Sequence, residues 1–238
     1  MDVRWFEQPL ASVSPQDDWL DAGEQAHCLS LRFAKRRSDW RLGRWTAKNA
    51  AAEYLGLACD AATLSTIHIR AAASGAPEVF VHDAPARVSI SLSHRDGIAA
   101  CALGPPEVKL GCDLETIEPR SDSFVEDYFT PEEQAAILHA PEAARCAQVA
   151  LLWSAKESVL KVLRTGLRRS TRQLSVVLRE EDLVYLSREL TATSHDLLSG
   201  MQPDESWLPL SVSCEGQIFR GRWIRGARLV RTLASLGC

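Results

Sequence analysis

The stretch Gly111-Cys112-Asp113-Leu114-Glu115 decides how this chain is organised, because it places two carboxylates inside an apolar, strand-like run. In a β-strand, residues two apart project to the same face and lie about 6.6 Å apart along the chain. Asp113 and Glu115 are therefore expected to share one face of a sheet. Like charges on one face repel unless a cation lies between them, and Mg²⁺ prefers such oxygen ligands. A strand end that runs into solvent would explain the same residues equally well.

A helix expected over residues 145–164 carries a second group of ionisable side chains. Its apolar residues recur at helical spacing and predict a side that faces the core: Leu152, Ala155, Val159, Val162 and Leu163. Trp153, Glu157 and Lys161 follow one another at four-residue spacing and form a stripe on another side. A surface ion pair between Glu157 and Lys161, worth about 0.3–0.5 kcal/mol, is the alternative explanation of this stripe.

Strand-like runs precede the acidic stretch and predict an antiparallel meander. The runs at 88–92, 98–103 and 108–114 are separated by the turn signals Arg95-Asp96-Gly97 and Gly104-Pro105-Pro106. The second turn is also the expected seam between two domains, residues 1–106 and 107–238. Because helices and antiparallel strands mix in both halves, the predicted fold class is α+β.

The other expected elements follow from capping and turn residues. Helices are expected over 17–34 and over 38–56, the second with Ser38 as its N-cap and Gly56 as its stop. A further helix is expected to start at Thr130-Pro131-Glu132-Glu133, with Thr130 as its cap. Later strands are expected at 173–179, 183–187, 208–213 and 217–224.

Two further motifs carry polar groups suited to phosphate. Ser93-His94 ends an apolar strand and offers hydrogen-bond donors, although a capped turn with an exposed imidazole is the simpler alternative. No Gly-x-Ser-x-Gly elbow accompanies this histidine, so no hydrolase triad is predicted. The segment from Lys35 to Lys48 holds six basic residues and predicts either a solvated helix face or a docking place for a phosphate.

Composition excludes several classes of protein. The chain has 238 residues and a formal net charge of −4, which argues against bulk binding of nucleic acid. No run approaches the roughly 18 apolar residues of a membrane span, and the N-terminus has no apolar signal-peptide core. Seven scattered cysteines without a Cys-x-x-Cys pair favour free thiols over a zinc site. We expect a cytoplasmic protein that binds neither nucleic acid nor membrane.

Taken in order, these motifs resemble the 4′-phosphopantetheinyl transferases, in particular the longer single-chain type that activates surfactin synthetase (Sfp-type). The resemblance rests on five segments: Arg36 to Arg44, Gly75-Ala76-Pro77, Ser93 to Gly97, Gly111 to Glu115 and Trp153 to Lys161. It implies transfer of the phosphopantetheine arm of coenzyme A to a serine of an apo carrier protein, leaving 3′,5′-ADP. The carrier is expected to be acidic, and the enzyme is expected to act as a monomer.

The resemblance also implies roles for individual residues. Asp113, Glu115 and Glu157 would hold Mg²⁺, and Glu157 would also take the proton of the carrier serine. Lys161 would stabilise charge on the phosphates, with His94 as a third catalytic residue. The residues implied in coenzyme A binding are Arg36, Arg44, Ser93, His94, Asp113, Lys156, Glu157 and Lys161.

The implied fold is a pseudo-dimer of two similar subdomains with coenzyme A in the cleft between them. The sequence departs from the family at Ala76, where lysine is usual, which puts that phosphate contact in doubt. Two other classes remain compatible with the residues: a coenzyme A or nucleotide sensor without turnover, and a metal-dependent phosphoesterase. Polyketide, nonribosomal-peptide, siderophore and fatty-acid carriers all remain open as partners.

Overall fold

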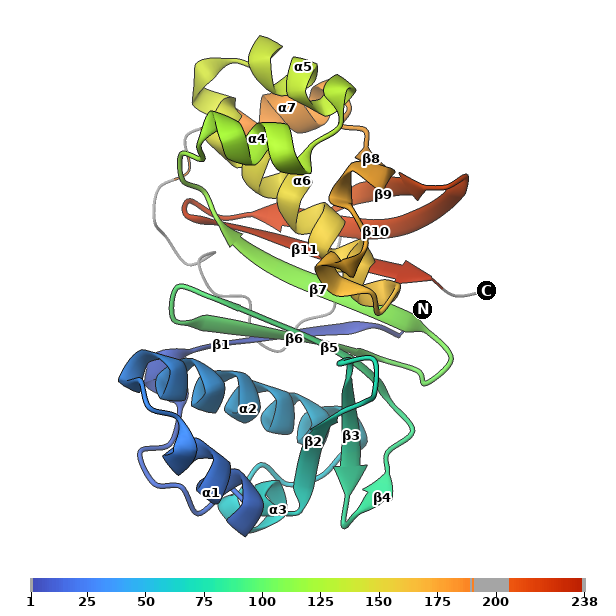
Figure 1. Cartoon of the computed structure of the whole chain (residues 1–238). Helices are drawn as coiled ribbons and strands as arrows, with labels where there is room; N and C mark the ends of the chain where they lie inside the picture. Colours follow the sequence, from blue (N-terminus) through green and yellow to red (C-terminus); the bar gives the residue numbers. More distant parts are fainter. Residues whose placement is uncertain (1, 189, 191–205, 237–238) are drawn as a thin grey trace. The chain divides into compact units, whose positions relative to one another are not determined.

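The computed structural model describes residues 2–188, 190 and 206–236, which form two compact units. The first unit extends to Val108 and the second begins at Lys109. Each unit combines helices with antiparallel strands, which confirms the predicted α+β class (Figure 1).

The first unit is built on an antiparallel sheet in the order β1-β6-β5, beside a smaller sheet in the order β2-β3-β4. The long helix α2 lies along the larger sheet (Figure 1). The strands are β1 (Arg4–Pro9), β2 (Ile67–Ala71), β3 (Pro77–Val81), β4 (Ala84–Pro85), β5 (Ser89–Arg95) and β6 (Ile98–Gly104). The helices are α1 (Ala22–Ser30), α2 (Ala34–Leu55) and α3 (Ala61–Ser65).

Helix ends in the first unit differ in part from the prediction. Helix α1 is shorter than the predicted 17–34, because the side chain of Asp21 caps it by accepting from the backbone N–H of Glu24. Helix α2 begins at Ala34, after the extended residue Phe33, so the prediction of Ser38 as N-cap is wrong. The basic residues before Ser38 are good helix formers and continue the helix upstream. Gly56 ends α2 with a left-handed φ of 70°, as predicted.

The predicted three-stranded meander is correct only for its first two strands. β5 and β6 form a hairpin whose turn residues Asp96 and Gly97 both have positive φ. The other neighbour of β6 is β1, with Trp5 opposite Ala102. The run at 108–114 belongs instead to a strand of the second unit. The meander was predicted because the three runs follow one another in the sequence. In the structure, the second neighbour of β6 is β1, which comes from the start of the chain.

The second unit contains a five-stranded antiparallel sheet in the order β7-β11-β10-β9-β8, and α6 lies across it (Figure 1). The strands are β7 (Lys109–Thr116), β8 (Leu174–Val176), β9 (Leu208–Cys214), β10 (Gln217–Arg225) and β11 (Leu229–Leu236). The helices are α4 (Asp122–Tyr128), α5 (Pro131–His139), α6 (Glu142–Val162) and α7 (Glu180–Leu186).

Capping residues explain why one predicted element of this unit is correct and another is wrong. Helix α5 starts as predicted, with Thr130 and Glu133 forming a reciprocal capping box. The strand predicted at 183–187 is wrong, because this segment lies in α7. Three acidic residues in the first turn of α7 favour a helix start, and Asp182 accepts from the backbone N–H of Arg179.

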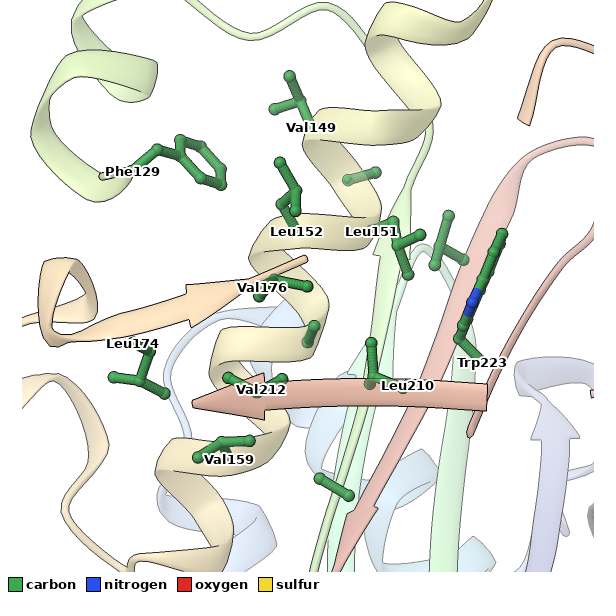
Figure 2. Close-up of a cluster of buried hydrophobic side chains, with 14 of the residues drawn as sticks. Phe129, Val149, Leu151, Leu152, Val159, Leu174, Val176, Leu210, Val212 and Trp223 are labelled. Atoms are coloured by element: carbon green, nitrogen blue, oxygen red, sulfur yellow. The ribbon is translucent and has the colours of Figure 1, made fainter. Parts of the chain in front are cut away.

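The core of the second unit lies between α6 and the sheet. Figure 2 shows Leu151 and Leu152 of α6 together with Leu210 and Val212 of β9 and Trp223 of β10. Leu152, Ala155 and Val159 are all buried, which confirms the apolar stripe predicted for this helix. Burial of this stripe is what holds α6 on the strands.

Gly111 sets how closely α6 approaches the sheet. A Cβ atom added at Gly111 would lie 1.8 Å from the carbonyl oxygen of Ser158 in α6. Small polar residues fill the same contact, since the hydroxyls of Ser154 and Ser158 lie 2.8 and 2.7 Å from the hydroxyl of Thr232 in β11. The helix backbone therefore packs directly on β7 at the residue that begins the acidic stretch.

The central helices of the two units share a motif. Trp45-Thr46-Ala47-Lys48 in α2 resembles Trp153-Ser154-Ala155-Lys156 in α6, and both lysine side chains are fully buried. Lys48 pairs with Glu24, and Lys156 pairs with Glu133 at 2.6 Å. Each glutamate belongs to the capping box of the helix before the one that carries its lysine: Glu24 to that of α1, and Glu133 to that of α5.

The surroundings of the two buried lysines also correspond. Each ammonium donates to two backbone carbonyls, those of Trp19 and Leu64 for Lys48 and those of Tyr128 and Thr171 for Lys156. Each also lies over an aromatic ring. A buried ammonium with this set of partners ties the start of a neighbouring helix to the central helix.

No helix in the described ranges has both the length and the apolar character that crossing a membrane would require.

Substituting Gly111 by alanine tests the close approach of α6 to β7. The added methyl group has no room beside the Ser158 carbonyl, so Gly111→Ala is expected to lower the free energy of unfolding by more than about 3 kcal/mol. The matched control is Gly43→Ala in α2, where an added Cβ meets no atom within 4 Å. That variant is expected to gain about 0.5–1 kcal/mol from helix propensity. Urea denaturation measures both, and equal stabilities would contradict the packing described.

Candidate active site

The acidic strand β7 presents its carboxylates to α6. Asp113 lies opposite Thr232 and Glu115 lies opposite Val230 in the pairing of β7 with β11. Both carboxylates are buried, so the alternative of a strand end running into solvent is wrong. Gly111, Asp113 and Glu115 are two residues apart in the strand and therefore lie on the same face of the sheet. The close contact of α6 at Gly111 thus brings the two carboxylates to the helix.

Helix α6 supplies a hydrogen-bond donor to each of these carboxylates. The indole Nε1 of Trp153 donates to Oε1 of Glu115 at 3.0 Å. Two turns later, Nζ of Lys161 donates to Oδ1 of Asp113 at 2.9 Å and to the carbonyl oxygen of Cys112 at 2.7 Å. The predicted stripe on α6 therefore contacts the acidic strand, and Lys161 forms its ion pair with Asp113 rather than with Glu157.

Glu157 lies between these two donors on the helix and has an unusual environment. Its Oε1 atom is buried and has no hydrogen-bond partner in the described part of the chain. Burial raises the pKa of the Glu157 carboxyl, and the nearby carboxylate of Asp113 raises it further, against the opposing effect of Lys161. A carboxyl with a raised pKa is a stronger base, which suits proton transfer near neutral pH.

Lys161 is held in its charged form. Burial is the largest single effect and lowers the pKa of Lys161, but the charge and hydrogen bond of Asp113 together with Cys112 and Glu157 outweigh it, so the pKa of Lys161 is raised. Two of its three N–H donors are directed at Asp113 and the Cys112 carbonyl. A fixed ammonium beside two carboxylates can bind an anionic group that approaches the same place.

Arg120, in the loop after β7, is a further member of the site that sequence reasoning missed. Its Nη2 donates to Oε2 of Glu115 at 3.0 Å and lies 3.2 Å from Oε1 of Glu118. The guanidinium lies over the ring of Phe124, 5.3 Å from the ring centroid. The signal in the sequence is a cation that follows Glu115 and Glu118 within five residues.

The three carboxylates offer suitable donors for a magnesium ion but are not gathered around one point. Carboxylate oxygens are the ligands that Mg²⁺ prefers, and the unpartnered Oε1 of Glu157 would gain a partner. Within the described residues, however, no group of three or more Asp, Glu, His or Cys side chains is arranged to hold a metal. Glu115 is engaged by Trp153 and Arg120 instead.

Lys156 has contacts that weigh against the prediction that it binds coenzyme A. Its side chain is 0% exposed, and its ammonium pairs with Glu133 and two backbone carbonyls. Burial lowers the pKa of Lys156, while Glu133 favours its charged form. These contacts give Lys156 a clear part in holding α5 and α6 together.

Three of the four residues of the first unit that were predicted to bind coenzyme A line one pocket of about 330 Å³. Arg44 on α2 and Ser93 and His94 on β5 all belong to its lining, as do Gly75 and Pro77 of the Gly-x-Pro motif. Arg36 is exposed and is not among the lining residues.

The guanidinium of Arg44 is fixed in this pocket. It donates to the carbonyl oxygen of Ile69, lies 3.7 Å from Glu24 and stacks over the ring of Trp40. Burial lowers the pKa of Arg44. Arg70 and Trp40 also line the pocket and were not singled out from the sequence. A pocket with two arginines and an aromatic ring suits a phosphorylated ligand.

Removing the ammonium of Lys156 is expected to be strongly destabilising. Lys156→Met leaves the Glu133 carboxylate buried without its cation, so the free energy of unfolding should fall by about 3–5 kcal/mol. The double variant Lys156→Met/Glu133→Gln should recover part of this loss, because it leaves no buried charge unpaired. Urea denaturation of the three proteins decides the point, and a Lys156→Met protein as stable as the wild type would contradict a structural role.

Replacing Glu157 by glutamine is expected to stabilise the metal-free protein in a pH-dependent way. The folded state holds the Glu157 proton more tightly than the unfolded chain does, since the pKa is raised. Stability is therefore lost as the pH rises from below the ordinary glutamate pKa of about 4.3 through the raised value. Glu157→Gln removes this loss, so its advantage should grow towards neutral pH and vanish at acidic pH. Denaturation curves with a chelator measure it, with the exposed Glu126→Gln as control.

Comparison with known proteins gives one match. Residues 109–210 match the family model of the 4′-phosphopantetheinyl transferase superfamily, which is less than half of the chain. The matched region begins at the first residue of β7 and contains Asp113, Glu115, Glu157 and Lys161. A comparison with curated proteins gave no match. The acidic strand and the helix that packs on it therefore lie in the part of the chain that is similar to the 4′-phosphopantetheinyl transferase superfamily.

Proposed function

We propose that this protein is an Sfp-type 4′-phosphopantetheinyl transferase, which moves the phosphopantetheine arm of coenzyme A to a serine of an apo carrier protein. The observation that carries the proposal is the contact of β7 with α6 inside the region that matches the superfamily. This contact places Asp113, Glu157 and Lys161 together, which joins a carboxylate base to a fixed cation.

The reaction replaces the phosphoanhydride bond of coenzyme A by a phosphodiester bond to the carrier serine. The carrier serine Oγ attacks the β-phosphorus of coenzyme A, the bond from that phosphorus to the bridging oxygen breaks, and 3′,5′-ADP leaves with the electron pair. Glu157 accepts the serine proton, directly or through a water, and its raised pKa suits that role. When bound, Mg²⁺ would be held by Asp113 and Glu157 with Glu115 beside them, and it would offset negative charge on the phosphates.

Lys161 stabilises charge in the same place. Its ammonium is fixed by Asp113 and the Cys112 carbonyl, and a third N–H, which has no acceptor among the described residues, would donate to a phosphate oxygen. Phosphoryl transfer requires little covalent work by the protein, so a positioned base and a fixed cation supply much of what the step needs.

Arg44, Ser93 and His94 would contact coenzyme A in the pocket of the first unit. Arg44 suits the 3′-phosphate, because its guanidinium is already oriented by Ile69 and Trp40. Arg36 would reach the same phosphate from its exposed position on α2. The shared motif of α2 and α6 supports the proposal that the chain is a pseudo-dimer of two similar subdomains.

The carrier partner is proposed to be acidic around its serine, whether it belongs to a polyketide, nonribosomal-peptide, siderophore or fatty-acid system. Arg168, Arg169 and Arg172 follow α6 and would form the basic surface that receives it. Arg169 pairs with the exposed Glu215 at 3.0 Å, which is the kind of ion pair that an acidic carrier would form with this surface.

Incubation with coenzyme A, Mg²⁺ and a panel of apo carrier proteins tests the function. A transferase adds the mass of one phosphopantetheine arm to the carrier and releases 3′,5′-ADP, both of which mass spectrometry detects. Glu157→Gln is expected to lower the rate by at least about 10²-fold while coenzyme A still binds, because the base is lost and the pocket is not. The control Glu126→Gln, a carboxyl on α4, should transfer at the wild-type rate.

Two results would overturn this assignment. Release of free phosphate with no gain of mass on any carrier would indicate a phosphoesterase. Binding of coenzyme A without reaction would indicate a sensor. Wild-type turnover by Glu157→Gln would remove Glu157 from the role of base.

A further inference from the structure

Glu115 has a hydrogen-bond donor on each of its two carboxylate oxygens. Its Oε1 accepts from the indole Nε1 of Trp153, and its Oε2 accepts from Nη2 of Arg120, each at 3.0 Å. The side chain is only 10% exposed. The guanidinium that lies against this carboxylate offsets its negative charge, and the same guanidinium repels a second cation.

The two donors of Glu115 are themselves held by aromatic rings of α4. The ring centroids of Phe124 and Tyr128 lie 5.1 and 4.9 Å from that of Trp153, both edge-on. The guanidinium of Arg120 lies over the ring of Phe124. Glu115, its two donors and these rings therefore form one closed set of contacts that joins β7, α4 and α6.

Glu157 lies one helical turn after Trp153 on α6, and its carboxyl has a different environment. Its Oε1 atom is buried and has no hydrogen-bond partner among the residues that the structure describes, whereas both oxygens of Glu115 have donors. Trp153 and Glu157 are four residues apart and lie on the same side of the helix. A contact that fixes the side chain of Trp153 therefore also fixes the turn that carries Glu157.

We propose that Glu115 is a positioning residue and not a ligand of the divalent cation: it holds Trp153, and through it the turn of α6 that carries Glu157. This inference rests on the proposed function, and it leaves Asp113 and Glu157 as the carboxylates that would hold Mg²⁺. It agrees with the finding that no three Asp, Glu, His or Cys side chains of the described residues are arranged around a metal. Two carboxylates suit Mg²⁺, which usually keeps several waters and binds substrate phosphates as well.

Hydrogen exchange of the Trp153 indole proton tests the contact with Glu115. The protein labelled with ¹⁵N-tryptophan contains seven indole groups, and Trp153→Phe identifies the signal of Trp153 by its loss. In Glu115→Ala this proton should exchange at least about tenfold faster than in the wild type, because its acceptor is lost. In the wild type, added Mg²⁺ should change its exchange rate by less than about threefold, because Glu115 keeps its donors.

Trp45 is the matched control for this measurement. It occupies the corresponding position on α2, and its Nε1 is buried with no hydrogen-bond partner in the described ranges. Its exchange rate should be the same in Glu115→Ala and in the wild type. If Glu115→Ala does not fold, Glu115→Gln replaces it, with an expected acceleration of about threefold for Trp153, because a neutral amide is a weaker acceptor than a carboxylate.

Titration with Mn²⁺, followed by the electron paramagnetic resonance signal of the free ion, separates positioning from metal binding. Glu115→Gln should bind Mn²⁺ within about threefold of the wild type, whereas Asp113→Asn should bind it at least about tenfold more weakly. In the transfer assay, Glu115→Gln should lower kcat about tenfold, because Glu157 is no longer held in place. The Mg²⁺ concentration that gives the half-maximal rate should stay the same.

Three results would overturn the proposal: an unchanged exchange rate of the Trp153 indole in Glu115→Ala, a marked acceleration of that exchange by Mg²⁺ in the wild type, or a loss of Mn²⁺ affinity in Glu115→Gln as large as that in Asp113→Asn. The exchange measurement on Glu115→Ala contains no metal, coenzyme A or carrier protein. A wild type that binds no Mn²⁺ would therefore count against the proposed magnesium site, and the exchange of Trp153 would still decide the role of Glu115.

Discussion

The backbone of α6 touches the backbone of β7 at Gly111, and the arrangement of the second unit depends on that contact. Any side chain at this position would overlap the carbonyl group of Ser158, so only glycine lets the helix approach so closely. In the same layer, the hydroxyls of Ser154 and Ser158 both hydrogen-bond to the hydroxyl of Thr232. The glycine of the acidic stretch thus has a packing role, and it brings Asp113 and Glu115 within reach of α6.

The charges at this contact leave one buried carboxyl oxygen without a compensating partner in the described ranges, at some expense of stability. Asp113 and Glu115 receive a lysine, an arginine and an indole, while Oε1 of Glu157 is buried with no partner in the part of the chain that the structure describes. A carboxylate in that position destabilises the folded state when it is ionised. Such tension is typical of functional groups, and the region that matches the 4′-phosphopantetheinyl transferase superfamily contains this site.

The two units use one structural device for different purposes. A buried lysine on the central helix pairs with a capping-box glutamate in both, Lys48 in α2 and Lys156 in α6. The residue after each lysine differs, because Asn49 follows Lys48 whereas Glu157 follows Lys156. The first unit thus keeps the helix-fixing pair without a carboxyl at the next position, and its α2 lines a pocket through Arg44 instead. The buried lysine–glutamate pair that fixes the central helix therefore occurs both with and without a carboxyl at the next position.

Local patterns in the sequence determined much of the second unit and of the site. The alternation around Asp113, the apolar stripe of α6 and the capping box at Thr130 each depend on residues close in the chain, and each is found in the structure. The same reasoning failed where a partner is distant. β6 pairs with β1, Ser38 is not a cap, and residues 183–186 are helical because of the acidic turn before them.

Only the tertiary structure decided what each charged side chain does. Lys156 and Lys161 look alike in the sequence, yet one is buried against Glu133 and the other holds Asp113. Arg120 lies five residues after Glu115 in the loop that follows β7, yet its guanidinium donates to the Glu115 carboxylate. The spacing of residues determines which side chains share a face of a strand or helix. The partner of a charge depends on which elements pack together, and that packing follows from long-range contacts such as the one at Gly111.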